Sequence, residues 1–251
     1  MTQLLVQNLC VDLSGRLVVT DANLRVDPGE FVGLIGPNGA GKSSLLRAAL
    51  GLIPHSGGVS NIAALPPAKR ALEAAWMPQG RDIAWGMTVG ALVALGRIPH
   101  ARPQVDDKAV TAALDALGIT HLRERDATRL SGGEQARVLI ARALAQDTPL
   151  VLADEPIAGL DPGHQIGAMA VFRGLADRGK GVVVSTHDLG LAARHCTRLI
   201  LMDHGRIVAD GAPLDVLTAD LLAQVFGITA YLGGGPDGPI FQPLDLTAQH
   251  R

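Results

Sequence analysis

The residues that decide the fold are Gly36-Pro37-Asn38-Gly39-Ala40-Gly41-Lys42-Ser43. They follow the apolar run 31–35 and precede a helix-prone segment that begins at Ser44. Glycines in such a strand-to-helix turn let backbone N–H groups close on phosphate oxygens, and the helix N-terminus adds positive potential. The flanks therefore favour a P-loop over the alternative of a plain glycine-rich turn.

The P-loop predicts a nucleoside triphosphate and Mg²⁺ as ligands. Lys42 should reach the β- and γ-phosphates, because it places a positive charge at the end of the loop. The Ser43 hydroxyl should ligate Mg²⁺, while water and phosphate oxygens supply much of the remaining shell. The nucleotide-binding residues expected here are Gly36, Pro37, Asn38, Gly39, Ala40, Gly41, Lys42, Ser43 and Ser44.

The composition is that of a globular protein. A length of 251 residues suits one large or two small domains, and a hydrophobic fraction of 47% is ample for a core. The net charge of −2, without runs of like charge, leaves no electrostatic footprint for nucleic acid. We therefore expect no nucleic-acid partner.

Neither the cysteines nor the N-terminus indicates an exported or membrane-spanning chain. Cys10 and Cys196 match no metal-binding spacing, so we expect two reduced, packed thiols and a cytosolic setting. The N-terminus lacks a basic region, and no apolar run reaches the roughly 18 residues that cross a bilayer. Any membrane role must be peripheral.

Hydrophobic patterning predicts an α/β protein. The first strands suggest an antiparallel layer, whereas later, fully apolar strands alternate with helices and favour a parallel sheet covered on both faces. The predicted strands are 4–8, 17–19, 23–26, 31–35, 59–63, 76–79, 150–155, 181–187, 199–203 and 206–209. The predicted helices are 44–50, 68–75, 88–97, 106–117 with N-cap Asp106, one with N-cap Ser131, and 213–226. A turn at Gly233-Gly234-Gly235-Pro236 and a short strand should follow.

Polar side chains fall at strand ends, where ligands bind in parallel sheets. Asp154 can hold Mg²⁺ through water, and the adjacent Glu155 can act as general base on the attacking water. His187 can hydrogen-bond the γ-phosphate, and Gln79 can touch Mg²⁺ or the water. The alternatives are a surface acid pair and two structural polar residues, but their order and strand-end placement favour the catalytic roles.

The second informative stretch is Leu130-Ser131-Gly132-Gly133-Glu134-Gln135. A serine and two glycines at a helix start make a second anion-binding site. Two such sites in one chain suggest that each γ-phosphate is bound from two sides. The two sides could come from two subunits. Ser131 and Glu134 also have the spacing of a capping box, and both interpretations can hold.

With these motifs in this order, the chain resembles the nucleotide-binding subunit of an ATP-binding cassette (ABC) transporter over roughly residues 3–225. The resemblance implies an α/β P-loop NTPase of the ABC ATPase fold: a mixed, mainly parallel core sheet, an N-terminal antiparallel β layer and an inserted helical subdomain at about 86–146. It places the ABC ATPase domain at residues 2–233 and a C-terminal tail at 234–251.

The resemblance also assigns roles and partners. It implies ATP hydrolysis with ATP and Mg²⁺, and a head-to-tail homodimer in which one subunit contacts the ATP in the other's P-loop. The family motifs fall on Gly36 to Ser43 (Walker A), Gln79 (Q-loop), Leu130 to Gln135 (signature), Leu150 to Asp154 (Walker B), Glu155 (catalytic carboxylate), Ala158-Gly159-Leu160-Asp161 (D-loop) and His187 (switch histidine). The implied metal contacts are Ser43, Gln79 and Asp154, and the implied nucleotide contacts across the dimer are Ser131, Gly132, Gly133 and Asp161.

Two departures from the family pattern stand out. The family usually stacks adenine on an aromatic residue in the first strands, where this chain has Leu13, and Ser14-Gly15 offers no ring either. The preference for ATP over GTP therefore rests on the family. The D-loop pair Ala158-Gly159 is smaller than the common form, although Asp161 is present.

Residues 80–89 and 93–100 are similar to those of ATPases that serve importers of ferric siderophores, haem and cobalamin. In that family the segment docks an integral-membrane permease, which implies a place on the cytoplasmic face of the inner membrane and an indirect link to a periplasmic or extracellular substrate-binding protein. The alternative for the segment is an ordinary amphipathic helix ended by Gly96 and Pro99. Alternatives for the function are an exporter subunit and a soluble ABC ATPase of iron–sulfur cluster assembly. Nothing here separates the cargoes.

Overall fold

The computed structural model describes residues 2–80, 83, 86–100, 107–235 and 238–247. The strands are β1 (Leu4–Leu13), β2 (Arg16–Val26), β3 (Phe31–Ile35), β4 (Gly57–Ser60), β5 (Ala74–Met77), β6 (Leu150–Asp154), β7 (Gly181–Ser185), β8 (Arg198–Asp203), β9 (Arg206–Gly211), β10 (Ile228–Gly235) and β11 (Gly238–Leu246). The α-helices are α1 (Lys42–Ala49), α2 (Pro67–Glu73), α3 (Val89–Ala94), α4 (Asp107–Ala116), α5 (Gly132–Ala145), α6 (Pro162–Asp177), α7 (Leu189–His195), α8 (Pro213–Val216) and α9 (Ala219–Leu221). Short 3₁₀ helices are η1 (Leu95–Arg97), η2 (Thr120–Leu122) and η3 (Ala127–Arg129), and η4 (Leu222–Phe226) is a π-helix.

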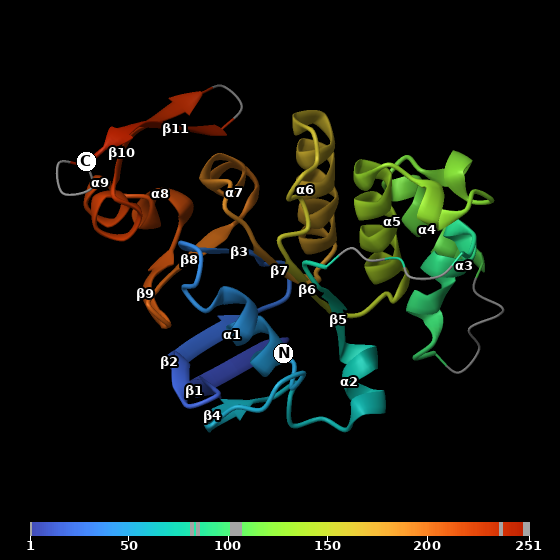
Figure 1. The fold of residues 1–251 in the computed structure, drawn as a ribbon, viewed down its shortest axis with the longest axis horizontal. Helices are drawn as coiled ribbons and strands as arrows, with labels where there is room; N and C mark the ends of the chain where they lie inside the picture. The colour runs from blue at the N-terminus through green and yellow to red at the C-terminus, as the bar shows by residue number, and fades with distance from the viewer. Residues whose placement is uncertain (1, 81–82, 84–85, 101–106, 236–237, 248–251) are drawn as a thin grey trace.

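A six-stranded sheet in the order β5-β6-β7-β3-β8-β9 carries the fold. Its strands are parallel except β9, which runs antiparallel to β8, so the predicted mixed sheet is confirmed. Figure 1 shows α1 and the N-terminal sheet on one side of it, and α6 and α7 on the other. The ends of β3, β6 and β7 therefore meet at one edge, because parallel neighbours finish side by side.

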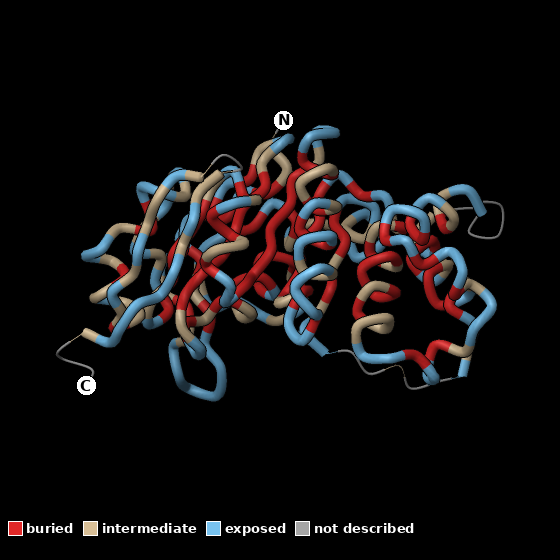
Figure 2. Tube along the Cα trace, turned by 90° about the horizontal axis from the view of Figure 1, so that it is seen from above, coloured by how far each residue is buried: buried red, intermediate tan, exposed pale blue. Residues whose placement is uncertain are grey.

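Side chains alternate along the central strands and separate two cores. In β3, Phe31 and Ile35 pack into the core that contains the helices α3 to α7. Val32 and Leu34 pack into the core formed with β1, β2 and α1. Figure 2 shows the resulting band of buried backbone through the middle of the molecule. Burial on both faces explains why these strands are continuously apolar in sequence.

The N-terminal sheet has the order β2-β1-β4, and its strands pair antiparallel, as predicted. Ser14 and Gly15 both have positive φ, 54° and 81°, which gives a tight turn whose twist suits a hairpin. The two short strands predicted over 17–19 and 23–26 are one strand, β2. Register shifts interrupt the pairing of β2 with β1. The polar residues between 19 and 23, which suggested a gap between two strands, lie at these irregularities.

The helical insertion lies between β5 and β6 and contains α3, α4 and α5, which lie together at one end of the molecule (Figure 1). Thr88 caps α3, and the helix predicted over 88–97 continues after Ala94 as the 3₁₀ turn η1. Ser131 caps α5, as predicted. The N-cap predicted at Asp106 lies outside the described residues.

Several predicted boundaries move by a few residues. Residues 74 and 75, predicted as helix, begin β5 because their side chains are buried in the sheet. The strand predicted over 59–63 is β4 at 57–60, and those predicted to end at Glu155 and His187 end at Asp154 and Ser185. Glu155 and His187 therefore lie in the loops that follow these strands, whereas Asp154 is the last residue of β6.

The C-terminal region differs most from its prediction. The single helix predicted over 213–226 is broken into α8, α9 and η4, and Leu217 between them has a non-helical backbone. Residues 233–235 of the predicted turn belong instead to β10, which pairs with β11, and Pro236 lies outside the described residues. The short strand predicted to follow is β11. The Tyr231 ring lies against Gly233: a Cβ there would stand 2.3 Å from the Tyr231 hydroxyl.

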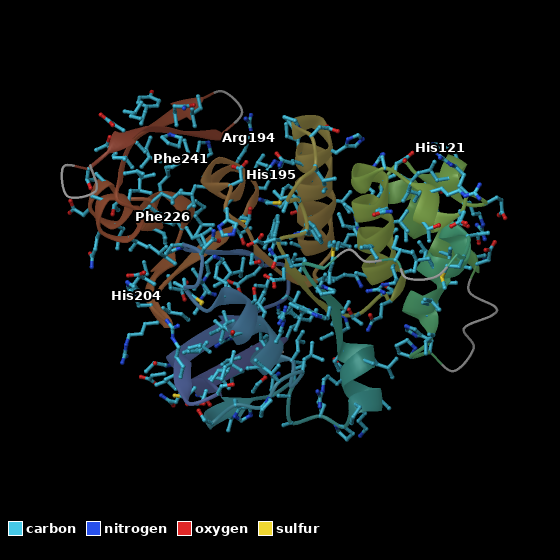
Figure 3. The ribbon with its side chains drawn as sticks, viewed as in Figure 1. His121, Arg194, His195, His204, Phe226 and Phe241 are labelled. Atoms are coloured by element: carbon cyan, nitrogen blue, oxygen red, sulfur yellow. The ribbon has the colours of Figure 1, made fainter. Side chains whose placement is uncertain are left out.

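The β10–β11 hairpin packs on the rest of the chain. Its inward residues Leu232 and Phe241 contact the helical core, and Figure 3 shows Phe241 and Phe226 in this part of the molecule. The division predicted between residues 233 and 234 thus falls inside β10. Within the described residues, no helix combines the length and apolar character needed to cross a membrane.

Candidate nucleotide-binding site

The P-loop connects β3 to α1 and is pressed against neighbouring backbone. Gly36 has φ 146°, and a Cβ there would lie 2.2 Å from the Met202 carbonyl oxygen. Gly41 has φ 97°, and its Cβ would lie 2.6 Å from the Val18 carbonyl oxygen. Both positions require glycine, because an L side chain would meet strain and a backbone clash together.

Lys42 lies against the inside of this loop. Its Nζ donates hydrogen bonds to the carbonyl oxygens of Gly36 at 2.7 Å and Pro37 at 3.0 Å, and the residue is only 5% exposed. Burial lowers the pKa of Lys42 from its ordinary value, whereas the charges of Glu155 and Asp154 act in the opposite direction. The lysine is therefore positioned beside the loop that would hold phosphate.

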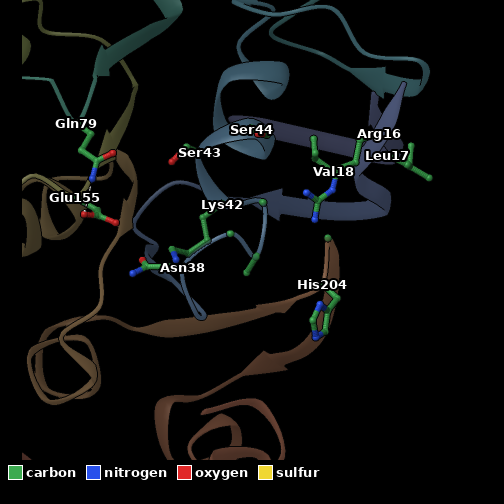
Figure 4. A pocket seen from close by; sticks show the side chains of 14 residues that line it. Arg16, Leu17, Val18, Asn38, Lys42, Ser43, Ser44, Gln79, Glu155 and His204 are labelled. Atoms are coloured by element: carbon green, nitrogen blue, oxygen red, sulfur yellow. Dashed lines mark hydrogen bonds between the residues drawn. The ribbon is translucent and has the colours of Figure 1, made fainter. Parts of the chain in front are cut away.

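A cavity of about 480 Å³ opens over the P-loop (Figure 4). Its volume falls within the range of small-molecule sites, roughly 300–1,000 Å³. Figure 4 shows Gln79 and Glu155 at one end, the P-loop in the middle, and the side chains of Arg16 and His204 at the other end. The lining residues are Arg16, Leu17, Val18, Asn38, Gly39, Ala40, Gly41, Lys42, Ser43, Ser44, Gln79, Glu155, His204 and Gly205.

Three of the residues predicted to be catalytic meet at one carboxylate. Gln79 Nε2 donates a hydrogen bond of 2.8 Å to Glu155 Oε2, and His187 Nε2 hydrogen-bonds the other oxygen, Oε1. The Glu155 side chain keeps 15% of its surface exposed, so it can still reach a reactant in the cavity. A carboxylate held at both oxygens has a defined orientation, which is what general-base chemistry requires.

The backbone at Glu155 is held in an unfavourable conformation. Its φ is 49°, in the left-handed region that side-chain-bearing residues rarely adopt. The Ser185 hydroxyl accepts a 2.9 Å hydrogen bond from the Glu155 N–H and thereby supports this turn. Strained backbone of this kind occurs often at functional sites, where surrounding contacts hold it in place.

Asp154 lies at the end of β6 and is fully buried. The Ser185 hydroxyl donates a 2.6 Å hydrogen bond to Asp154 Oδ1. Asp154 Oδ2 is buried and has no hydrogen-bond partner within the described part of the chain. An unsatisfied buried carboxylate oxygen is costly, so this atom fits a role toward a metal ion or a metal-bound water.

The signature and D-loop residues do not line this cavity. Ser131 forms the predicted capping box: its N–H and its hydroxyl each donate a 2.8 Å hydrogen bond to Glu134 Oε2, and these bonds lower the pKa of Glu134. Asp161 caps α6 by accepting a hydrogen bond from the His164 N–H at 3.0 Å. A single copy of the chain therefore brings together the P-loop, Gln79, Glu155 and His187. Ser131 and Asp161 of the same copy lie outside this cavity.

Three residues of the site were not predicted from the sequence. Ser185 bonds both acidic residues, yet it appears in the sequence as one polar residue at the end of an apolar strand. Arg16 and His204 line the cavity, whereas Leu13, the position expected near the base, does not. The available signal was that Arg16 follows one two-residue hairpin turn and His204 lies in another, but the sequence does not show that these turns flank the P-loop.

This fold and site define a P-loop nucleotide-binding protein. Residues 19–158 match the ABC transporter family, and the chain belongs to that family. It is 42% identical over 243 residues to the hemin import ATP-binding protein of Pseudomonas fluorescens, covering 92% of this chain and 95% of the relative. It is 41% identical over 240 residues to the cobalamin import ATP-binding protein of Halobacterium salinarum, covering 92% of this chain but 60% of that longer relative.

Solved structures of ABC cassettes share the fold. One, described as an inward-facing conformation of a metal-chelate type ABC transporter, superposes with a TM-score of 0.85 and 26% identity over 99% of both chains. A dimeric bacterial ABC transporter cassette superposes with a TM-score of 0.76 and 26% identity, covering 84% of this chain and 99% of the other. The ABC ATPase fold predicted from the motifs is confirmed.

Proposed function

We propose that the chain is the ATP-hydrolysing subunit of a membrane ABC importer that energises uptake of a metal chelate such as haem, a ferric siderophore or cobalamin. The observation that carries the ATPase part is the meeting of Gln79 and His187 on the Glu155 carboxylate at one end of the P-loop cavity. The import part is supported by the relatives named for hemin and cobalamin import.

The site geometry suits hydrolysis of the γ-phosphoryl group. The P-loop amides and Lys42 bind the triphosphate, and Glu155 accepts a proton from the attacking water. The new bond joins the water oxygen to phosphorus, the bond to the β-phosphate oxygen breaks, and ADP and inorganic phosphate leave. His187, bonded to Glu155, orients the carboxylate.

The residues present fit Mg²⁺. The donors would be the Ser43 hydroxyl, the Gln79 amide oxygen and, through water, the buried Oδ2 of Asp154. No cluster of three or more His, Cys, Asp or Glu side chains suited to a metal occurs among the described residues, so nucleotide oxygens and water would complete the shell. When bound, the ion would neutralise charge on the β- and γ-phosphates.

The separation of Ser131 and Asp161 from the cavity supports a head-to-tail homodimer. In such a dimer the partner copy supplies Ser131, Gly132, Gly133 and Asp161 to the nucleotide, and the helix start at Ser131 offers N–H groups to the γ-phosphate. The dimer would sit on the cytoplasmic face of the membrane, bound to permease subunits that receive cargo from a substrate-binding protein outside.

The test uses one exposed apolar residue on the helical insertion and a matched one elsewhere. Ile98, in the segment proposed to dock the permease, and Leu244, on the β10–β11 hairpin, are each 65% exposed. Tagged protein is purified from gently solubilised membranes, and co-purifying polypeptides are identified by mass spectrometry. We expect a polytopic permease with the native chain and with Leu244→Asp, but not with Ile98→Asp. Recovery of soluble partners alone, with full ATPase activity, contradicts the importer.

A further inference from the structure

One end of the P-loop cavity is formed by residues that the family motifs do not include. Arg16, Leu17 and Val18 of β2 line it from one wall, and His204 and Gly205 line it from the other. If the triphosphate lies along the P-loop with its γ-phosphate toward Glu155, the base lies at this opposite end (Figure 4). A role of these residues in binding the base therefore rests on the proposed binding of ATP.

The turn that carries His204 is held rigidly. Asp203 of β8 pairs with Arg206 of β9, so His204 and Gly205 form a two-residue hairpin turn, and both have positive φ, 44° and 78°. The N–H of Gly205 donates a 3.1 Å hydrogen bond to the carbonyl of Ala40, and its carbonyl accepts a 2.8 Å hydrogen bond from the Thr20 N–H. The turn is thus tied directly to the P-loop and to β2.

The His204-Gly205 turn is also tightly packed against its neighbour. A Cβ on Gly205 would stand 2.7 Å from the Val18 carbonyl oxygen, so the backbone of the turn packs directly on β2. His204 is therefore presented at a constant position relative to the phosphate-binding loop. A side chain that contacts the base must lie at a fixed distance from the phosphate-binding loop, because the distance between the phosphates and the base of a nucleotide varies little.

The His204 ring takes little part in packing the fold. Its side chain is 94% exposed, and its nearest ionic contact is Asp203 Oδ1 at 3.8 Å from Nε2. Exposed aromatic rings offer a face for stacking, and imidazole stacks on nucleic-acid bases. Figure 3 shows His204 near the tip of the β8–β9 hairpin, far from the exposed His121 on the helical insertion.

Arg16 approaches from the other wall. It begins β2 directly after the tight turn at Ser14-Gly15, and Figure 4 shows its guanidinium directed from that hairpin toward the turn of His204. Among the described residues, no ion pair holds Arg16 elsewhere. A free guanidinium plane stacks well on flat aromatic surfaces and also favours electron-rich rings.

We propose that the His204 imidazole and the Arg16 guanidinium form a two-sided platform that holds the base of the bound nucleotide. They take over the stacking of the base, which the family pattern places at Leu13. Leu13 itself does not line the cavity. No Phe, Tyr or Trp is present among the described lining residues. Stacking recognises the face of a base rather than its hydrogen-bonding edge, so ATP and GTP bind within a few-fold of each other, and pyrimidine triphosphates bind more weakly.

The key variant is His204→Asn, because asparagine tolerates a left-handed backbone and preserves the turn while the ring is lost. Equilibrium binding is measured for Mg-ATP, Mg-GTP and inorganic tripolyphosphate, which has no base. Base stacking on an exposed aromatic side chain is weaker than stacking in an enclosed site, so the expected loss is modest. We expect dissociation constants for ATP and GTP to rise about 5- to 10-fold, with tripolyphosphate unchanged.

Matched controls separate the ring from other effects. His121→Ala removes an exposed histidine outside the cavity, Leu13→Ala removes the residue expected by sequence comparison, and neither should change ATP binding. His204→Phe retains a ring and should keep ATP affinity within about 2-fold of native. Arg16→Ala should weaken ATP binding while leaving tripolyphosphate binding unchanged.

Three outcomes would overturn the platform. Unchanged ATP affinity in His204→Asn removes the ring from base binding, and an equal loss for tripolyphosphate assigns His204 or Arg16 to the phosphates. A large drop with Leu13→Ala moves the base to the first hairpin. In each of these cases the native chain still binds ATP, so the proposed function stands. If the native chain binds no ATP, both proposals fail together.

Discussion

Gln79 Nε2 donates a 2.8 Å hydrogen bond to Glu155 Oε2. This bond joins the loop after β5, next to the helical insertion, to the loop after β6 in the core sheet. Because the insertion begins a few residues after Gln79, a movement of the insertion would pull on the same amide that orients the carboxylate. The contact would link the permease proposed to dock on the insertion with the group proposed to activate water.

Ser185 is predicted to support both acidic residues at once. Ser185→Ala removes the hydroxyl that donates to Asp154 Oδ1 and accepts from the Glu155 N–H. The Glu155 N–H keeps the Ser185 carbonyl oxygen as an acceptor at 3.2 Å, but the buried Asp154 Oδ1 loses its donor. This loss should lower the free energy of unfolding by about 1–3 kcal/mol and should also raise the Mg²⁺ concentration needed for half-maximal activity. Denaturant unfolding and a Mg²⁺ titration of hydrolysis measure the two effects.

The control for this variant is Thr148→Val. Thr148 is also buried, 1% exposed, and its hydroxyl donates a 2.6 Å hydrogen bond to the Leu150 carbonyl, but it lies at the start of β6 rather than at its end. We expect a comparable loss of stability with an unchanged Mg²⁺ requirement. The same Mg²⁺ shift in both variants would show that Ser185 acts only through stability.

Two glycines of the P-loop should respond differently to alanine. In Gly36→Ala the new methyl would meet the Met202 carbonyl oxygen at 2.2 Å, so the loop must open or β8 must move. Gly39 also has positive φ, 79°, but no atom lies within 4 Å of its Cβ position. We expect Gly36→Ala to abolish ATP binding and Gly39→Ala to destabilise by roughly 1 kcal/mol while binding persists. Equal loss of binding in both would mean that chain flexibility, rather than the close approach, explains Gly36.

Ser131→Arg tests the shared site of the proposed dimer. The bulky cation would occupy the helix start that a partner presents to the γ-phosphate. A single copy holds its own P-loop apart from Ser131, so ATP should still bind with near-native affinity while hydrolysis falls at least about 100-fold. Hydrolysis at the native rate would contradict the two-subunit site, and circular dichroism checks that α5 remains folded.

Cys196 should be inert in the folded protein. Burial raises the pKa of its thiol to about 12, so the reactive thiolate is scarce at neutral pH. In a Cys10→Ser background, we expect no labelling of Cys196 by iodoacetamide until denaturant unfolds the chain. Rapid labelling of the native protein at pH 8 would show that the region around α7 and β8 opens locally.

Most of the local elements, such as turns, strands and helix caps, could be predicted from the sequence. Few of the contacts between segments that are distant in the sequence could be predicted. The strand-to-helix turn at Gly36 to Ser43, the apolar strand that carries Asp154 and the cap at Ser131 were predicted correctly, because each depends on residues close in sequence. The turn before β11 was placed too early, because the Gly233 run favours a turn locally, whereas residues 233–235 pair with β11 in the fold. The end of the cavity lined by Arg16 and His204 could not be predicted, since Ala40 and Gly205 meet only after β8 and β9 are in place.

The most direct measurement is the ATP turnover of Glu155→Gln compared with Lys42→Ala. The amide retains the size of the side chain but cannot accept the proton from water, and general-base catalysis contributes on the order of 10²–10⁴-fold. Glu155→Gln should bind ATP with native affinity and hydrolyse it at least about 100-fold more slowly. Lys42→Ala should instead lose ATP binding, because it removes the charge that faces the phosphates. Near-native turnover in Glu155→Gln would contradict the account.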